Sequence, residues 1–196
     1  MSVIVAVKEN DVVYMGADSQ TSIGGNKIHV LNESGFKIVR QDNGVLVGMC
    51  GDVGGHNAVT TEKNFVSLDE NGMLTKKHIV NEIIPKLLKP DLKLYDEKKQ
   101  DLSISLILAF KDKLYKIMSN LTVIKCNTHT SSGSGKSYTR YDLYAHGELP
   151  VKERIVKALR SSANRDASVG APFVLIDTKN LEYEIVDYEG RYDSNI

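Results

Sequence analysis

The sequence lacks the features that would place a protein in several specialised classes. Its 196 residues include only two cysteines, Cys50 and Cys126, which indicates reduced thiols and not a disulfide framework. Lys plus Arg and Asp plus Glu number 25 each, so the charge balance predicts neither a nucleic-acid partner nor an anionic membrane surface. No apolar run approaches the roughly 18 residues that a spanning helix needs. No basic leader or cleavage site precedes the first strand, so we expect a cytoplasmic protein.

What is present is typical of a globular chain. Hydrophobic residues make up 41% and charged residues 26% of the sequence. The length suits one core of useful size, so we expect a single domain over residues 1–196.

The first fifty residues are predicted to be β-structure. Residues 3–8 and 12–17 are apolar and β-branched, and they flank a turn, which predicts a hairpin. Residues 36–40 and 45–50 flank Asn43-Gly44, a strong hairpin signal.

Two helices are predicted next, one from the glycines at 51–55 to about residue 68 and one from about Thr75. In the second helix, apolar residues recur every three or four positions, at Ile79, Val80, Ile83, Ile84, Leu87 and Leu88. So wide an apolar face predicts burial between layers. Pro85 is expected to kink or end this helix.

The second half repeats the pattern of strands followed by helices. Strands are predicted at 103–109, 114–118 and 121–126, followed by the polar stretch 127–137. A helix with one apolar face starts after Pro150, and 173–176 with 181–186 forms the last hairpin. Tyr138, Tyr141 and Tyr144 are expected to pack on a neighbour as one helix face. Strands that come in adjacent hairpins favour an α+β fold of antiparallel sheets covered by helix layers.

The start of the chain places a hydroxyl where a free amine can activate it. If Met1 is removed, Ser2 carries both its hydroxyl and an α-amine with a pKa of roughly 7.7–8.0. Such an amine can act as the general base for its own side chain.

Three later residues supply what such a nucleophile needs. Lys37, in the third predicted strand, would disfavour the protonated form of the amine and so lower its pKa. Asp18, at the end of the second strand, would keep that lysine charged and oriented. Gly51, at the end of the fourth, could present a backbone N–H to a developing oxyanion.

With these residues in place, the segment from Ser2 to Gly55 resembles the start of a proteasome β-subunit or of the HslV peptidase, both N-terminal nucleophile hydrolases. The resemblance rests on four motifs: Ser2, Gly16-Ala17-Asp18, Lys37-Ile38-Val39 and Met49-Cys50-Gly51. The lysine motif requires a short insertion around residues 26–31. The resemblance implies a four-layer αββα sandwich.

The resemblance also implies further site residues. Ser134, in Gly133-Ser134-Gly135, and Asp166, in Arg165-Asp166-Ala167, would orient the N-terminal amine. Ser22 and Met49 would contact the substrate. No cofactor is required, and a structural Na⁺ or Mg²⁺ could bind the backbone carbonyls of Ala163, Asp166 and Val169.

The function implied is that of a self-compartmentalising endopeptidase that cleaves polypeptides inside stacked homo-oligomeric rings, fed by an ATP-driven unfoldase. Three positions depart from the family pattern. The nucleophile is Ser and lacks the methyl group of Thr. Asp52 replaces a glycine beside the oxyanion position, and Val169 stands where β-subunits carry a Ser.

Other interpretations stay open at this point. A ring or scaffold subunit that retains Met1 would be inactive, and a hydrolase of a small amide could use the same nucleophile. Residues 130–137, TSSGSGKS, nearly fit a phosphate-binding loop, with residues 173–177 as the acidic strand. Cys50 is expected to be a small core residue. The five histidines show no metal-ligand spacing.

Overall fold

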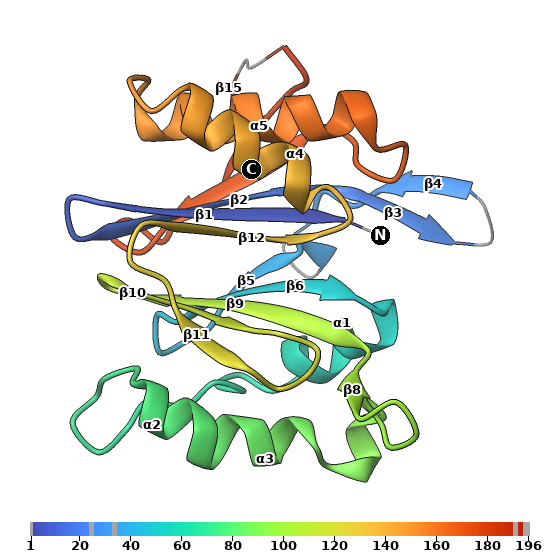
Figure 1. The fold of residues 1–196 in the computed structure, drawn as a ribbon, viewed down its shortest axis with the longest axis vertical. Coiled ribbons are helices and arrows are strands. Elements are labelled where there is room, and N and C mark those ends of the chain that lie inside the picture. The colour runs from blue at the N-terminus through green and yellow to red at the C-terminus, as the bar shows by residue number, and fades with distance from the viewer. Residues whose placement is uncertain (1, 24–25, 33–34, 190–191, 194–196) are drawn as a thin grey trace.

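The structure is a computed structural model that describes residues 2–23, 26–32, 35–189 and 192–193. Met1, on which the retention alternative depends, lies outside these residues. Figure 1 shows four layers, in which a pair of helices, two facing sheets and a second group of helices are stacked. The αββα sandwich expected from the sequence is confirmed.

The two facing sheets are antiparallel throughout the described residues. The first sheet, in spatial order, contains β12 (His129–Gly133), β1 (Val3–Glu9), β2 (Val12–Asp18), β13 (Phe173–Asp177), β14 (Glu184–Val186) and β15 (Tyr192–Asp193). The second contains β11 (Val123–Lys125), β10 (Lys113–Ile117), β9 (Ile104–Phe110), β6 (Leu46–Gly51) and β5 (Ile38–Arg40). Two small hairpins are added, β3 (Gln20–Ile23) with β4 (Asn26–His29) and β7 (Tyr95–Asp96) with β8 (Asp101–Leu102). The predicted insertion thus folds as β4 and the residues after it.

Helices cover the outer faces of both sheets (Figure 1). Helices α4 (Lys136–Ala145) and α5 (Val151–Arg165) lie on the first sheet. The second sheet is covered by α1 (Val53–Thr60) and by a continuous helical run of α2 (Lys76–His78), the π-helical segment η2 (Ile79–Ile83) and α3 (Ile84–Leu87). A short 3-10 helix, η3 (Pro90–Leu92), follows.

Two helix predictions need correction. The first helix ends at Thr60 and not near residue 68. The second is not buried between layers, because it forms an outer layer: Ile79 and Ile83 are fully buried, whereas Val80 is 45% exposed. Pro85 does not end the run, because the π-helical turns before it shift the carbonyls with which its ring would clash.

The central strands are apolar on both faces because each lies between two layers. In β1, Val3, Val5 and Val7 pack against α5, whereas Ile4 and Ala6 face the second sheet. Side chains alternate along a strand, and burial on both sides therefore produces the continuous apolar run in the sequence. By the same alternation, Ser2 lies on the side of Ile4, facing the second sheet.

The polar stretch at 127–137 contains a strand that its composition did not predict. Residues His129–Gly133 form β12, which pairs with β1 from Val3↔Gly133 to Val7↔His129. Because these backbone groups are used in the ladder, and because all sheet pairings here are antiparallel, the phosphate-binding-loop interpretation is wrong. Asp177 closes a turn by accepting hydrogen bonds from the amides of Lys179 and Asn180.

The tyrosine prediction holds only in part: Tyr138 lies under Arg165 and Tyr144 packs edge-on against His129, but the face as a whole is not buried. Tyr141 is 78% exposed and Tyr144 65% exposed, since α4 buries its opposite face through Thr139 and Leu143. Within the described parts of the chain, no helix combines the length and apolarity required to cross a membrane.

Candidate active site

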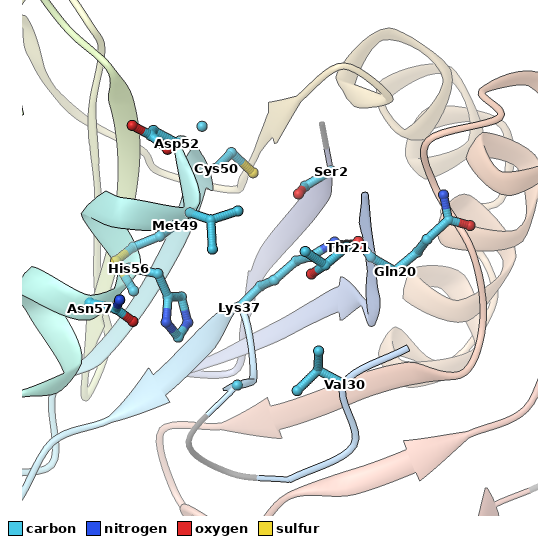
Figure 2. A pocket seen from close by; sticks show the side chains of 13 residues that line it. Ser2, Gln20, Thr21, Val30, Lys37, Met49, Cys50, Asp52, His56 and Asn57 are labelled. Atoms are coloured by element: carbon cyan, nitrogen blue, oxygen red, sulfur yellow. Dashed lines mark hydrogen bonds between the residues drawn. The ribbon is translucent and has the colours of Figure 1, made fainter. Parts of the chain in front are cut away.

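Ser2 lies at the opening of β1, where the two sheets leave a pocket at their edge. The pocket has a volume of about 220 Å³ and is lined from the β3 strand, the segment before β5, the end of β6 and the start of α1. Figure 2 shows Ser2 and Thr21 on one side, Met49, Cys50 and His56 on the other, and Lys37 between them. Ser2 is only 8% exposed, so its side chain is largely shielded from bulk water.

A buried ion pair lies beside Ser2. Lys37 Nζ is 2.7 Å from Asp18 Oδ1, and both side chains are almost fully buried. Lys37 also donates a hydrogen bond to the Gln20 carbonyl at 2.5 Å. Burial raises the pKa of the Asp18 carboxyl, and the Lys37 ammonium opposes that rise. The structure thus brings the two predicted residues into one pair, of which Lys37 lines the same pocket as Ser2.

Backbone amides from both sides of the site hold the Asp18 carboxylate in place. Val3 N–H donates to Asp18 Oδ1 at 2.9 Å, and Gly170 N–H donates to Oδ2 at 3.4 Å. The carboxylate therefore links the start of β1, the end of β2 and the loop after α5. A carboxylate held this way fixes the lysine relative to Ser2.

Gly51, the predicted oxyanion donor, ends β6 next to Ser2 and lines the same pocket. Its φ of +132° lies in a region that side chains rarely adopt. A Cβ atom here would lie 2.2 Å from the Ser103 carbonyl oxygen of the neighbouring strand. Glycine is therefore required both by conformation and by space.

Gly51→Ala is expected to destabilise the protein by at least about 3 kcal/mol, because strain and a backbone clash act together. The matched control is Gly72→Ala. Gly72 has a φ of +66° but no atom within 4 Å of the added carbon, so about 1–2 kcal/mol is expected there. Urea unfolding of both variants measures the difference. Equal losses would contradict the clash.

Three residues form a hydrogen-bonded group on the other side of Ser2. Ser134 Oγ donates to the Ser2 carbonyl and lies within 3.3 Å of Ser168 Oγ. Ser168 in turn donates to Asp166 Oδ1 from its hydroxyl at 2.5 Å and from its amide at 3.0 Å. Burial raises the pKa of the Asp166 carboxyl, but the hydrogen bonds from Ser134 and Ser168 outweigh this and hold it below its ordinary value.

Ser168 is a site residue that the sequence reasoning missed. Val169 was compared with the supporting Ser of β-subunits, and it is in fact a buried core residue. The hydroxyl is supplied one position earlier. The signal was available, since a Ser two residues after Asp166 can reach its carboxylate in a short turn.

Glycine is required at position 133, where the segment Gly133-Ser134-Gly135 passes close to Ser2. Gly133 has a φ of +96°, and a Cβ there would lie 2.0 Å from the Ser2 carbonyl oxygen. This close contact places Ser134 beside the N-terminal residue.

Met49 and Cys50 line the pocket, as does Asp52. Burial raises the pKa of the Cys50 thiol to about 12, so the thiol stays protonated near neutral pH and is not a competing nucleophile. Asp52 caps α1 by accepting a hydrogen bond from Gly54 N–H at 3.1 Å, which explains a carboxylate at this position. Ser22 lies in β3 opposite Lys27, and its contact with substrate stays a prediction.

The proposed cation ligands lie in the turn that follows α5. The Asp166 carbonyl accepts a hydrogen bond from Val169 N–H at 2.9 Å, so one of its two lone pairs is used. Ala163 is in the last turn of α5, where carbonyls lack helical partners. Among the residues described, no group of three or more His, Cys, Asp or Glu is placed to hold a metal ion. A Na⁺ or Mg²⁺ bound by carbonyls alone stays a prediction.

The layers, the sheet order and the position of Ser2 together define a class of fold. This is the fold of the N-terminal nucleophile hydrolases of the proteasome β-subunit type. Among solved structures, Thiobacillus denitrificans BPH in complex with epoxomicin matches with a TM-score of 0.73 and 20% identity, over 92% of this chain and 99% of that one.

Two other solved structures are similar. HslV from Trypanosoma brucei matches with a TM-score of 0.63 and 17% identity, over 89% of this chain and 98% of that one. Anbu, the ancestral β-subunit from Yersinia bercovieri, matches with a TM-score of 0.71 and 13% identity, over 94% of this chain and 86% of that one. No protein-family model and no curated protein matches the sequence.

Proposed function

We propose that this chain is a peptide hydrolase that uses Ser2 as an N-terminal nucleophile after removal of Met1. The observation that carries the proposal is the position of Ser2 at the start of β1, in one pocket with Gly51 and with Lys37, whose ammonium pairs with Asp18. Each of these residues has a distinct task in acyl transfer.

The chemistry follows from these positions. Ser2 Oγ attacks a peptide carbonyl, and its proton passes through a water to the α-amine of the same residue. Lys37, fixed by Asp18, lowers the pKa of that amine, and Gly51 N–H stabilises the oxyanion. The amine then protonates the departing peptide nitrogen. Water hydrolyses the resulting ester and regenerates Ser2.

Ser134, Asp166 and Ser168 act as positioning residues in this proposal. Ser134 holds the Ser2 carbonyl, and Asp166 provides a negative charge near the N-terminus. A carboxylate there orients the ammonium form of the amine. Ser168 keeps that carboxylate ionised and aimed.

Ser168→Ala is expected to raise the pKa of Asp166 and to lower peptide hydrolysis about tenfold at pH 7. Asp166, whose pKa lies below its ordinary value, stays ionised at pH 7. The loss therefore comes from a carboxylate that is no longer aimed at the N-terminus, and it lowers the plateau of the pH–rate profile. Ser161→Ala is the matched control, since Ser161 lies in α5 and contacts Arg165. Superimposable profiles for the Ser168 variant and the unchanged protein would refute this role.

The biological setting is part of the proposal. Polypeptides would be the substrates, homo-oligomeric rings would enclose the sites, and an ATP-driven unfoldase would deliver the chains. The similarity to HslV and Anbu supports this assembly. Sedimentation of the purified protein distinguishes a ring from a small oligomer.

Two measurements test the nucleophile. Intact mass should show a chain without Met1, and a peptide β-lactone should then acylate Ser2, with the adduct located by peptide mapping. A stable chain that keeps Met1 would refute the mechanism and favour an inactive ring subunit. A processed chain that hydrolyses small amides but neither peptides nor lactones would favour the amidohydrolase.

A further inference from the structure

A second pocket opens on the other side of Ser2. It has a volume of about 310 Å³ and shares Ser2, Cys50 and Gly51 with the first pocket. We call the first the apolar pocket, after Val30, Met49 and Val53, and the second the lysine pocket, after Lys116 and Lys136.

The sheet order places the two pockets on opposite sides of Ser2 and Gly51. The apolar pocket is lined from the β5 side of β6, and the lysine pocket from the β9 and β10 side. On the side of the first sheet, the apolar pocket uses the start of the β3–β4 hairpin, which follows β2, whereas the lysine pocket uses β12. Because β6 lies between β5 and β9, and β1 between β2 and β12, a ligand crossing Ser2 can enter both.

The lysine pocket carries positive charge that the described residues do not neutralise. Its lining includes Lys116 and Lys136 but no Asp or Glu. Neither lysine belongs to a salt bridge in the portion of the chain that the structure describes. Lys116 is half-buried, and burial together with the nearby charge of Lys136 lowers the pKa of its ammonium. An anion between the two ammonium groups would relieve this repulsion.

The remaining polar lining is suited to an anion that accepts hydrogen bonds. Lys116 Nζ donates a hydrogen bond to the Ser131 carbonyl of β12 at 2.7 Å, which holds the ammonium beside that strand. Ser105 and Ser132 hydroxyls lie 2.6 Å apart, so one of them donates to the other. Lys136 is the first residue of α4, whose N-terminus has no side-chain cap among the described residues. The N-terminal end of a helix favours negative charge.

We propose that the lysine pocket is a second substrate subsite that binds a carboxylate on the opposite side of the scissile bond from the residue in the apolar pocket. The inference rests on the proposed function, since it needs a peptide carbonyl at Ser2. It specifies the substrate class further: a peptide with an apolar residue on one side of the cleaved bond and an acidic group on the other.

The test uses internally quenched peptides and the full-length protein with a free Ser2. Each peptide carries Leu on one side of the scissile bond and Glu, Gln or Lys on the other, in both orders. In one order we expect kcat/KM to be about tenfold higher for Glu than for Gln, with Lys lowest. The preference should shrink as salt screens the charges. Peptides that end in a free acid or an amide one residue beyond the cleaved bond distinguish a side-chain carboxylate from a terminal one.

Variants of the two lysines assign the preference to the pocket. Lys116→Gln and Lys136→Gln should each reduce the Glu-over-Gln ratio of kcat/KM severalfold. Lys136 is exposed, so its variant remains informative if Lys116→Gln does not fold. Lys125→Gln is the matched control, because it removes the same charge from exposed β11 outside both pockets. Equal ratios in all variants would overturn the subsite.

A binding measurement separates this inference from the proposed function. Fluorescence anisotropy with the Ser2→Ala variant compares labelled Glu and Gln peptides without any cleavage. Tighter binding of the Glu peptide that depends on Lys116 and Lys136 supports the subsite even if the unchanged protein cleaves nothing. Active protein with no charge preference in cleavage or binding would refute the subsite and leave the hydrolase intact.

Discussion

Ser2→Ala is expected to reduce peptide hydrolysis by at least about 10³-fold, because no other side chain in the pocket can replace the attacking oxygen. The Cys50 thiol is buried and protonated, and Thr21 lacks an α-amine of its own. Ser2→Thr should retain activity, since it keeps the hydroxyl on the N-terminal residue. Initial rates with one quenched peptide compare the three proteins.

The control for this prediction is the stability of the Ser2→Ala variant. Ser134 contacts the Ser2 carbonyl and not its hydroxyl, so the alanine variant keeps that hydrogen bond. Its urea midpoint should therefore match that of the unchanged protein, and the lost rate can be attributed to chemistry. Hydrolysis by Ser2→Ala at the original rate would require a different nucleophile.

The central strands and the ion pair were predictable because local pattern and burial agree. The side chains of β1 are buried on both faces of the strand, so its sequence does not alternate between apolar and polar residues. A continuous apolar run is expected of a strand that two layers cover. Asp18 is identified at the end of the second predicted strand, and Lys37 within the third. Their distance of 2.7 Å, however, depends on how the two sheets face each other, which spacing along the chain does not determine.

Strand β12 could not be predicted because its stability comes from its neighbours. His129–Gly133 lacks an apolar alternation, yet it completes the edge of the first sheet by pairing with β1. Ser132 is buried where β12 meets the second sheet and bonds to Ser105 there. A polar strand of this kind is specified by tertiary context and not by propensity. The lysine pocket depends on the same strand, so it was also invisible in the sequence.

Lys37→Met is expected to destabilise the fold by about 3–5 kcal/mol, because it leaves the Asp18 carboxylate buried without its counter-ion. Asp18 has no exposed side-chain surface, and among the described residues its hydrogen-bond donors other than the lysine are backbone amides. Hydrolysis should also fall sharply, since the amine of Ser2 loses the neighbouring charge that lowers its pKa. Urea unfolding and initial rates measure the two effects.

The pH dependence of the stability of Lys37→Met identifies the buried charge of Asp18 as the cause of its destabilisation. Burial raises the pKa of Asp18 above its ordinary 3.8, and without Lys37 the opposing contributions given by the described residues are the backbone hydrogen bonds from Val3 and Gly170. The folded state then binds more protons than the unfolded state above that value, so stability falls as pH increases from about 4 toward 7. The destabilisation should therefore be smaller at pH 4 than at pH 7.

Two further variants make the prediction for the buried pair decisive. Lys37→Met with Asp18→Asn removes both charges and should recover part of the lost stability, because the amide still accepts from Val3 N–H. Lys63→Met breaks the exposed pair with Asp42, whose atoms are 3.7 Å apart, and should change stability by less than about 1 kcal/mol. If Lys37→Met changed stability as little as Lys63→Met at both pH values, the Asp18 carboxylate would not depend on Lys37 for its stability in the fold. The lysine would then be free to act on Ser2 without a fixed position, contrary to the proposed mechanism.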